Sequence, residues 1–308
     1  MGTMGSSIGA IAAVLSGVVW GFLGVFSREF AAIGLDSVQV TCLRFLFLTL
    51  AVFPYMFLFR RDELRIDRKS LVILILMGTL GFGLSSIFYV ASANLVSLGL
   101  ISVLANSAPF FVILFSVPLL GEDITRYKIV AVIVAFFGCV LCTGVLTDPG
   151  DMNVLGVLMG LGSGFVYSFY TMGSKVVSSR GVSVMGILFY VSLFAFIFTL
   201  PMCDPIDAIN VMATDGYALV LMLLFALGMT MTQMFLYSFS IARIGAGKVS
   251  ILVYSETICA TMIGLLWYGE MLTFEIVAGI VLTMVGLVII YLDKQNDAVA
   301  GPEGPDSG

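Results

Sequence analysis

Two ionisable side chains stand inside stretches that are otherwise apolar, and their types suit them to chemistry. Glu256 lies in ILVYSETICATM, residues 251 to 262, and Arg44 lies in VTCLRFLFLTL, residues 40 to 50. A charged group near the centre of a bilayer costs roughly 2.5 to 3.5 kcal/mol on insertion scales measured for Asp, Lys and Arg. We therefore expect Glu256 to face the interior of a helix bundle and to have a function there.

Glu256 has two possible functions and one structural alternative. It could exchange a proton with one side of the membrane, or it could bind the cationic group of a solute. Alternatively, it is a structural carboxyl group that is hydrogen-bonded to Ser or Thr on neighbouring helices. Tyr254 lies two residues earlier, and residues two apart on a helix point nearly opposite ways, so the two side chains cannot both face one narrow cavity.

Arg44 has three possible roles. Its long side chain could snorkel to the outer surface, it could pair with Glu256, or it could hold a carboxylate of a substrate. We favour snorkelling or a structural pair over substrate binding.

Polar and aromatic residues recur at helical spacing in five further stretches, and this spacing places each set on one face of a helix. The sets are Ser16 and Trp20; Ser85, Tyr89 and Ser92; Ser102 and Asn106; Ser163, Tyr167, Tyr170 and Ser174; and Thr230, Gln233 and Tyr237. Together they would line one amphipathic cavity. The alternative is helix packing, because small and hydroxyl residues join membrane helices whether or not a substrate passes.

The candidate site follows from these sets. The predicted substrate-binding residues are Trp20, Tyr89, Asn106, Tyr167, Gln233, Tyr237 and Glu256. Glu256 and Arg44 are the candidates for proton or charge coupling, with protons as possible coupled ions.

Catalysis and nucleic-acid binding find no support in the chain. It has no His for general base work, and no phosphate-loop motif precedes Lys248. Cys139 and Cys142 form a C-x-x-C without a second pair, so we expect neither metal nor cofactor, and we interpret the five cysteines as buried residues. The chain carries no basic patch, which argues against nucleic acid as a partner.

The composition indicates a membrane protein. Hydrophobic residues make up 60% of the 308 residues, charged residues only 11%, and the mean hydropathy is +1.13. Soluble domains are about half apolar and a quarter charged. The chain is therefore predicted to be an all-α polytopic membrane protein in contact with membrane lipid.

Breaks made of Gly, Pro and charge divide the chain into ten stretches of about 20 apolar residues, the length that spans a bilayer. The predicted spans are 8–27, 38–58, 71–92, 99–119, 129–146, 154–174, 183–201, 216–239, 249–267 and 276–292. The first lacks a basic region before it, so we do not expect it to be a cleaved signal peptide. Residues 293–308, which are polar and rich in Gly and Pro, are expected to form a disordered tail.

Charge asymmetry predicts the orientation, because Lys and Arg near short loops stay in the cytoplasm. The loops that follow even-numbered spans, together with the tail, carry Arg60, Arg61, Arg65, Arg68, Lys69, Arg126, Lys128, Lys175, Arg180, Arg243, Lys248 and Lys294. The other loops carry Arg28 alone. The chain is thus predicted to cross the cell membrane with both termini in the cytoplasm.

The chain also repeats itself. A shift of 147 residues aligns SGVVWGF (16–22) with SGFVYSF (163–169), and a shift of 148 aligns Tyr89 with Tyr237 and Ser107 with Ser255. We therefore predict two homologous five-helix units, 1–146 and 147–292. Five is odd, so the second unit enters the membrane from the opposite side, and inverted repeats of this kind typically build alternating-access transporters.

The chain resembles the EamA-type members of the drug/metabolite transporter superfamily over roughly residues 8 to 292. The resemblance lies in AAVLSGVVWGF (12–22), LRFLF (43–47), NSAPFFVILFSVPLLGE (106–122) and SETICATMIGLLWYGE (255–270), with a helix ending in Gly-Glu in each half. It implies two five-helix bundles around a central cavity that opens alternately to each side, with no nucleotide-binding domain. Thr257 departs from the family, which usually has Pro there, whereas Pro109 keeps its place; a kink in the ninth span is therefore left open.

These observations favour a secondary active transporter of a small organic solute, amino-acid-like or a related metabolite, that exports or exchanges it. One alternative is a transporter of organic cations, such as choline-like amines or drugs, held by aromatic side chains and Glu256. A channel is a further alternative. A membrane-embedded enzyme is more remote, since it would need a polar catalytic cluster near one membrane surface.

Overall fold

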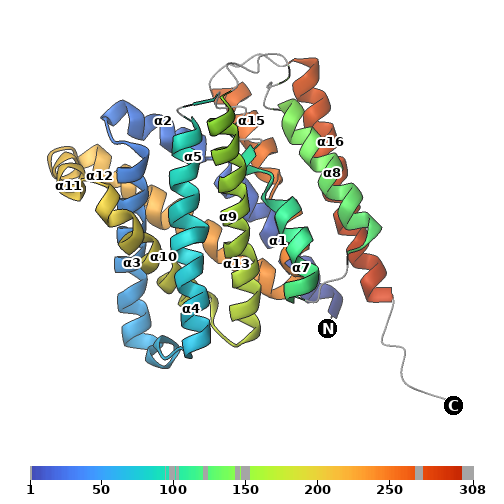
Figure 1. Ribbon diagram of the computed structural model, residues 1–308, viewed down its shortest axis with the longest axis horizontal. Helices are drawn as coiled ribbons and strands as arrows, with labels where there is room; N and C mark the ends of the chain where they lie inside the picture. Colours follow the sequence, from blue (N-terminus) through green and yellow to red (C-terminus); the bar gives the residue numbers. More distant parts are fainter. Residues whose placement is uncertain are drawn as a thin grey trace.

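The computed structural model describes residues 2–93, 95–96, 101, 104–120, 124–142, 146, 153–267 and 273–299. Within these ranges all regular secondary structure is helical, which confirms the all-α prediction. The long helices run side by side across the molecule (Figure 1).

The helices fall into two sets along the chain. The first set is α1 (Gly2–Trp20), α2 (Leu23–Ile33), α3 (Ser37–Phe59), η1 (Arg61–Leu64), α4 (Arg68–Leu76), η2 (Met77–Leu84), α5 (Ser85–Ala93), α7 (Ala108–Leu120) and α8 (Arg126–Cys142). The second is α9 (Val154–Ser179), α10 (Val184–Thr199), η3 (Leu200–Met202), α11 (Pro205–Thr214), α12 (Gly216–Leu223), η4 (Leu224–Thr230), α13 (Met231–Ile244), α14 (Ala246–Leu252), α15 (Ser255–Trp267) and α16 (Phe274–Val299).

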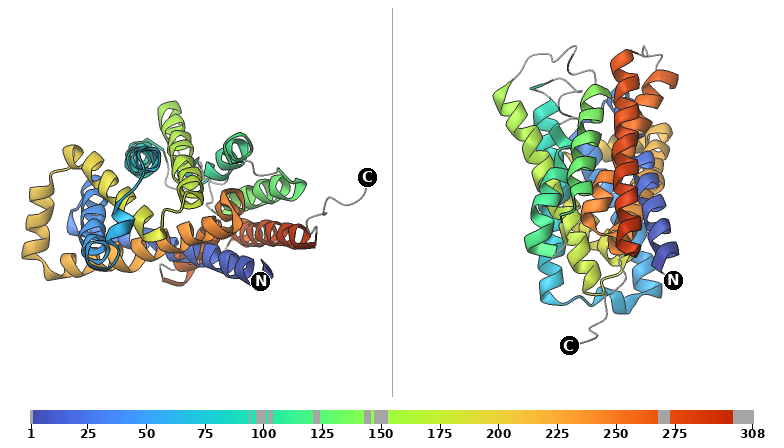
Figure 2. Two further views of the ribbon diagram at one scale, coloured as in Figure 1. Left: turned by 90° about the horizontal axis from the view of Figure 1, so that it is seen from below. Right: turned by 90° about the vertical axis from the view of Figure 1, so that its right-hand side faces the viewer.

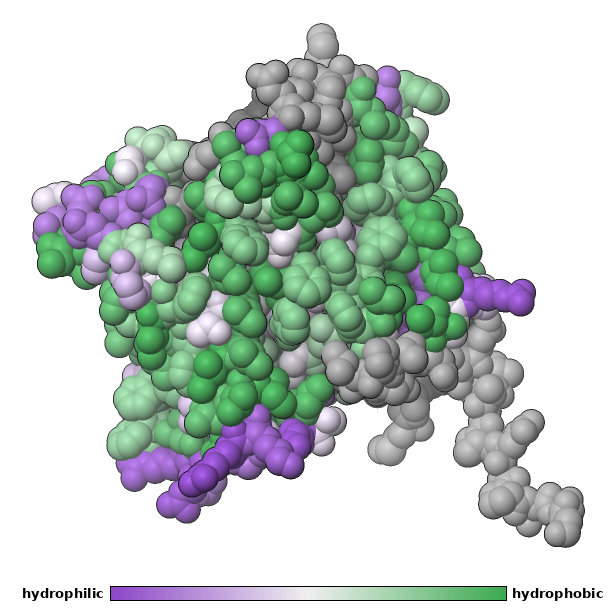
Figure 3. Space-filling view, in the orientation of Figure 1, coloured by the Kyte–Doolittle hydropathy of each residue, from purple (hydrophilic) through white to green (hydrophobic). Residues whose placement is uncertain are grey.

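Helices of spanning length occur where the sequence predicts them. Seven described segments are long and apolar enough to cross a membrane: Ser6–Ile33, Val38–Phe59, Arg68–Ser92, Val154–Ser179, Val184–Met202, Gly216–Ile244 and Ala246–Gly264. The helices α7, α8 and α16 lie at the predicted fourth, fifth and tenth spans. Apolar side chains cover the middle of the face seen in Figure 3, and hydrophilic residues gather toward its ends, as expected for a protein surrounded by lipid.

Local backbone features recur at the repeat spacing. The third span of each half contains a π-helical segment, η2 and η4. Gly34 ends α2 with a φ of 91°, and Gly181 follows α9 with a φ of 85°, a conformation that glycine adopts without strain. Asp36 and Ser183 then cap the next helix through their side chains. The two halves therefore build the same turns from equivalent positions.

Different side-chain contacts join the helices at the two ends of the bundle. At one end Arg180 pairs with Asp67 at 3.2 Å, and the Tyr190 hydroxyl donates to the Leu64 carbonyl at 2.9 Å, so the segment between α3 and α4 contacts the end of α9 and helix α10. At the other end the Tyr217 hydroxyl donates to Glu29 at 2.8 Å. The chain starts α1 and ends α16 at the first of these ends, as Figures 1 and 2 show.

The C-terminal helix is longer than its predicted span. Among the described residues α16 continues to Val299, past residue 292, where the disordered tail was predicted to begin. Residues 300–308 lie outside the described part of the chain, as do Glu122 and Glu270 of the two Gly-Glu pairs.

Candidate functional site

Glu256 lies directly after a break in a helix. The helix α14 ends at Leu252, Val253 and Tyr254 form a turn, and α15 begins at Ser255, which places Glu256 in the first turn of α15. The break occurs although Thr257 stands where Pro would favour one. Discontinuous helices near the membrane centre are a frequent feature of solute sites in transporters.

A glycine on α1 allows this break to pack closely. A Cβ atom at Gly17 would lie 2.7 Å from the Val253 carbonyl oxygen and 3.0 Å from the Glu256 nitrogen, both of them backbone atoms. In the other half, Asn106 and Ser107 form a turn before α7, and a Cβ at Gly164 of α9 would lie 2.9 Å from the Ala105 carbonyl oxygen. Each break is thus held against a glycine of the opposite half.

Glu256 is a partly exposed residue, and its carboxyl group lies near aromatic hydroxyls. It lies close enough to interact electrostatically with the hydroxyls of Tyr89 on α5 and Tyr167 on α9, and with the Cys259 thiol one turn further along α15. No Lys or Arg among the described residues forms an ion pair with it. A carboxyl group without a counter-ion in this position can bind a proton or a cation.

Tyr254 points elsewhere, in agreement with the helical register. It is only 2% exposed, and its hydroxyl donates to the backbone carbonyl of Asn106 at 2.7 Å. The two broken helices are therefore joined by a direct hydrogen bond. The side chain of Asn106 is itself partly exposed.

Three tyrosines form one cluster. The rings of Tyr170 and Tyr237 stack with centroids 5.7 Å apart, and the Tyr167 ring lies 5.8 Å from Tyr170 and 6.4 Å from Tyr237. The Tyr237 hydroxyl is 2.6 Å from the Thr171 hydroxyl, and both side chains are buried. Gln233 is also buried, so of the predicted site residues Tyr237 and Gln233 are enclosed by protein, whereas Tyr167 is partly exposed.

Arg44 lies under aromatic rings. Its guanidinium carbon is 4.6 Å from the Phe45 ring centroid, 5.3 Å from that of Phe225 and 5.9 Å from that of Trp20. The residue is 6% exposed, so protein covers it and it does not snorkel to the surface. It forms no pair with Glu256 in the described structure, but it does interact electrostatically with the hydroxyl of Tyr167.

The serines of the predicted polar faces mostly join helices. Ser85 on α5 and Ser163 on α9 bond to each other and to each other's backbone carbonyls at 3.1 to 3.2 Å. Ser92 donates to the Gly156 carbonyl at 2.7 Å, and Ser16 donates to Ala13 within its own helix. Ser102 lies outside the described residues.

Sequence reasoning did not single out the phenylalanines around the site. The ring centroid of Phe82 in η2 lies 4.6 Å from that of Tyr170 and 5.4 Å from that of Phe45. Phe82 therefore connects the tyrosine cluster to the rings that cover Arg44. Phe45 follows Arg44 directly in the chain, and that adjacency was the available signal. Phe82 and Phe225 gave none, because an apolar residue in an apolar span does not reveal its neighbours.

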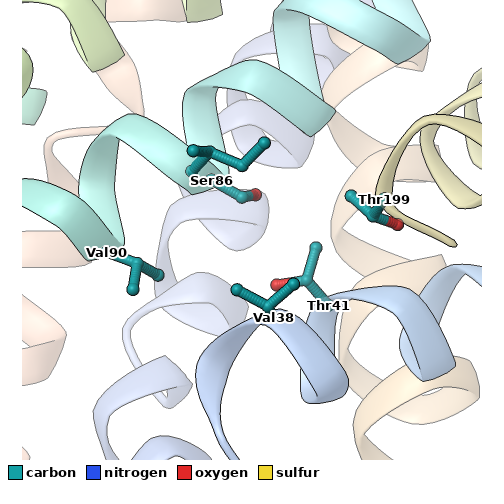
Figure 4. Close-up of a pocket in the computed structure, with 6 residues that line it drawn as sticks. Val38, Thr41, Ser86, Val90 and Thr199 are labelled. Carbon is teal, nitrogen blue, oxygen red and sulfur yellow. The ribbon is translucent and has the colours of Figure 1, made fainter. Parts of the chain in front are cut away.

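A small pocket is lined by a different set of residues. Val38 and Thr41 of α3, Ser86, Ile87 and Val90 of α5, and Thr199 of α10 line it, as Figure 4 shows in part. It is too narrow to hold a water molecule, so it does not compete with Glu256 and its neighbours as a place for a solute.

Comparisons with known proteins agree with this architecture. Residues 7–144 and 154–292 each match the EamA-like transporter family. An uncharacterized transporter of Archaeoglobus fulgidus is 28% identical over 92% of this chain and 96% of its own length. The uncharacterized transporter YdfC of Bacillus subtilis is 25% identical over 75% of each chain.

A solved crystal structure shares the fold, with a TM-score of 0.77 and 17% sequence identity over 96% of this chain and 99% of the other. The apolar helices and the two family matches define a multi-pass helical membrane protein with two copies of one domain. The chain belongs to the EamA-like transporter family.

Proposed function

We propose that the protein is a secondary active transporter that moves a small organic solute across the cytoplasmic membrane by alternating access, as an exporter or exchanger. The solute is amino-acid-like or a related metabolite, and both termini lie in the cytoplasm. The observation that carries the proposal is the position of Glu256 at a helix break, partly exposed and without a counter-ion among the described residues.

The surroundings of Glu256 support a site for a solute with a cationic group. Tyr89 and Tyr167 come from different halves of the chain, and both interact with the same carboxyl group. A solute bound between them would contact both halves at once. Movement of one half against the other would then open the site to each side in turn.

The same residues support a second candidate, a transporter of organic cations. Tyr89, Tyr167 and Trp20 are partly exposed residues, and aromatic faces bind quaternary ammonium groups by cation-π contacts. The two candidates differ in one property, since an amino acid carries a carboxylate and a choline-like amine does not.

A ligand screen followed by counterflow tests both candidates. The purified protein in detergent is screened by thermal shift against amino acids, nucleobases, quaternary amines and polyamines. A ligand at about 100 times its dissociation constant stabilises by roughly 2.7 kcal/mol, which a melting curve resolves. Stabilising solutes are then tested for counterflow into proteoliposomes.

We expect zwitterionic solutes to stabilise the protein and to exchange across the membrane. Stabilisation and counterflow by quaternary amines alone would replace the metabolite with an organic cation. Single-channel currents in planar bilayers would instead identify a channel, because carriers turn over too slowly to give them.

A further inference from the structure

The buried guanidinium of Arg44 has an N–H donor without an acceptor. The residue is 6% exposed, and its Nε is buried with no hydrogen-bond partner. Guanidinium carries five N–H donors in a planar fork, and it stays charged at every physiological pH. A buried charged group with an unmade hydrogen bond is unfavourable, so an acceptor at this position would remove that cost.

The aromatic rings around Arg44 do not replace that acceptor. Trp20, Phe45 and Phe225 lie 4.6 to 5.9 Å from the guanidinium carbon, and cation-π contacts of this kind attract the charge. They accept no N–H hydrogen bond with the geometry of an oxygen acceptor. They do exclude water, which strengthens the attraction between the guanidinium and any anion that reaches it.

No carboxylate of the described residues occupies the position beside Arg44 where an anion would bind. Glu256 is not paired with Arg44 in the described structure, although both interact with the hydroxyl of Tyr167. Gln233 approaches the same hydroxyl, and its Oε1 is buried without a donor. The hydroxyl of Tyr167 therefore interacts with three groups: Arg44, whose Nε donor is unfilled, Gln233, whose Oε1 acceptor is unfilled, and the carboxyl group of Glu256.

We propose that Arg44 is an anion subsite that binds the carboxylate of the transported solute. The assignment rests on the proposed transport function, and it makes the solute a carboxylate-bearing metabolite with its polar or cationic part directed toward Glu256. A carboxylate matches the guanidinium fork, since the two carboxylate oxygens can accept two parallel N–H hydrogen bonds. An inorganic anion such as chloride shares part of this chemistry, and the experiment separates the two sources.

The test uses small anions as probes of the purified full-length protein. Melting temperatures are titrated with sodium propionate at fixed chloride and ionic strength, and separately with sodium chloride. Three related probes follow: phenylalanine, 3-phenylpropionate, which lacks the amine, and 2-phenylethylamine, which lacks the carboxylate. Arg44→Gln is compared with Arg61→Gln, because Arg61 also lies over a ring, 4.3 Å from the Phe57 centroid, but is exposed at the start of η1.

We expect saturable stabilisation by the carboxylates in the wild type and in Arg61→Gln. In Arg44→Gln the apparent affinity for them should fall at least about tenfold, as expected for a lost hydrogen-bonded charge contact. Equal responses of Arg44→Gln and the wild type would overturn the subsite. Chloride-specific stabilisation that carboxylates do not displace would also overturn it, in favour of a bound inorganic anion.

The probes and the counterflow assay keep the subsite testable even if a variant fails, and they separate it from the transport function. If Arg44→Gln does not fold, the wild type alone decides, because equal binding of phenylalanine and 2-phenylethylamine would contradict a carboxylate subsite. Counterflow of an amino acid with unchanged affinity in Arg44→Gln would reject the subsite and leave the transport function standing. Arg44-dependent carboxylate binding without counterflow of any solute would keep the subsite and reject the transport function.

Discussion

Gly17 and Gly164 hold equivalent positions in the two halves, and each lies against a break in a helix of the opposite half. The charged residues do not follow this symmetry. By the 148-residue shift Glu256 aligns with Ala108, and by the 147-residue shift Arg44 aligns with Val191. The packing surfaces are thus duplicated, whereas each charge occurs once.

The difference has a physical reason. Both halves must approach each other closely at the breaks, and a Cβ at either glycine would meet backbone atoms, so the same restriction acts twice. A solute has no two-fold symmetry, and a second charge in the membrane would add cost without a matching group. The pair Trp20 and Tyr167 is intermediate, because the positions are equivalent and both aromatic side chains approach Arg44.

The largest effect is expected where the halves differ most. Glu256→Gln should preserve folding but lower transport at least about tenfold and abolish its pH dependence, because the carboxyl group can no longer bind a proton or a cationic group. The titratable groups that face Glu256 are Tyr89, Tyr167 and Cys259. Proteoliposome uptake measured over a range of pH provides the readout, and unchanged pH dependence and affinity would make Glu256 a structural residue.

The shared packing surfaces should respond equally in the two halves. Gly17→Ala and Gly164→Ala are each expected to cost about 3 kcal/mol, because the added Cβ meets backbone atoms that cannot move aside. Gly24→Ala is the control, since nothing lies within 4 Å of a Cβ there. Melting temperatures of the three variants in detergent measure the effect. A loss confined to one of the two buried glycines would disprove their equivalence.

Equivalent tyrosines should behave differently. Tyr237→Phe leaves the buried hydroxyl of Thr171 without its partner, at a cost of about 1.5 kcal/mol in stability. Tyr89→Phe removes a hydroxyl for which no hydrogen bond is seen among the described residues, so it should keep stability while weakening solute binding. Melting curves and ligand affinities of both variants test this contrast. The reverse assignment of effects would place Tyr237, and not Tyr89, at the solute.

The smallest effect is expected at the helix caps at the start of the third spans. Asp67 and Asp215 both cap a helix, but among the described residues only Asp67 pairs with a cation, Arg180. Hydrogen bonds from Ser70, with a further contribution from Arg180, hold the pKa of Asp67 below its ordinary value. Its folded-state pKa is therefore depressed, so its stabilising contribution is present above the unfolded pKa and is lost as pH falls through the folded pKa.

Asn caps helices as well as Asp does, so Asp67→Asn isolates the charge. We expect a small decrease in melting temperature near neutral pH that disappears in acid, with Asp215→Asn as the control that shows less change. A difference for Asp67→Asn that persists unchanged at low pH would exclude the charge as its cause.

Much of the fold could be predicted from the sequence. Hydropathy located the helices because each span must satisfy its own backbone hydrogen bonds within lipid, a local requirement. The repeat was visible because equivalent turns need equivalent residues, as at Gly34 and Gly181. The site was less predictable. Ser85 and Ser163 each belong to a helically spaced polar set, and such a set fits a cavity wall and a packing contact equally well.

The sequence by itself determined the membrane-spanning architecture, the duplication, and the presence of one carboxylate and one guanidinium inside apolar spans. Only the tertiary structure decided that the ninth span breaks before Glu256 without a proline, that Gln233 and Tyr237 are buried, and that Arg44 lies beneath three aromatic rings. The first set follows from properties that each segment has alone. The second depends on contacts between segments far apart in the chain, which no local pattern encodes.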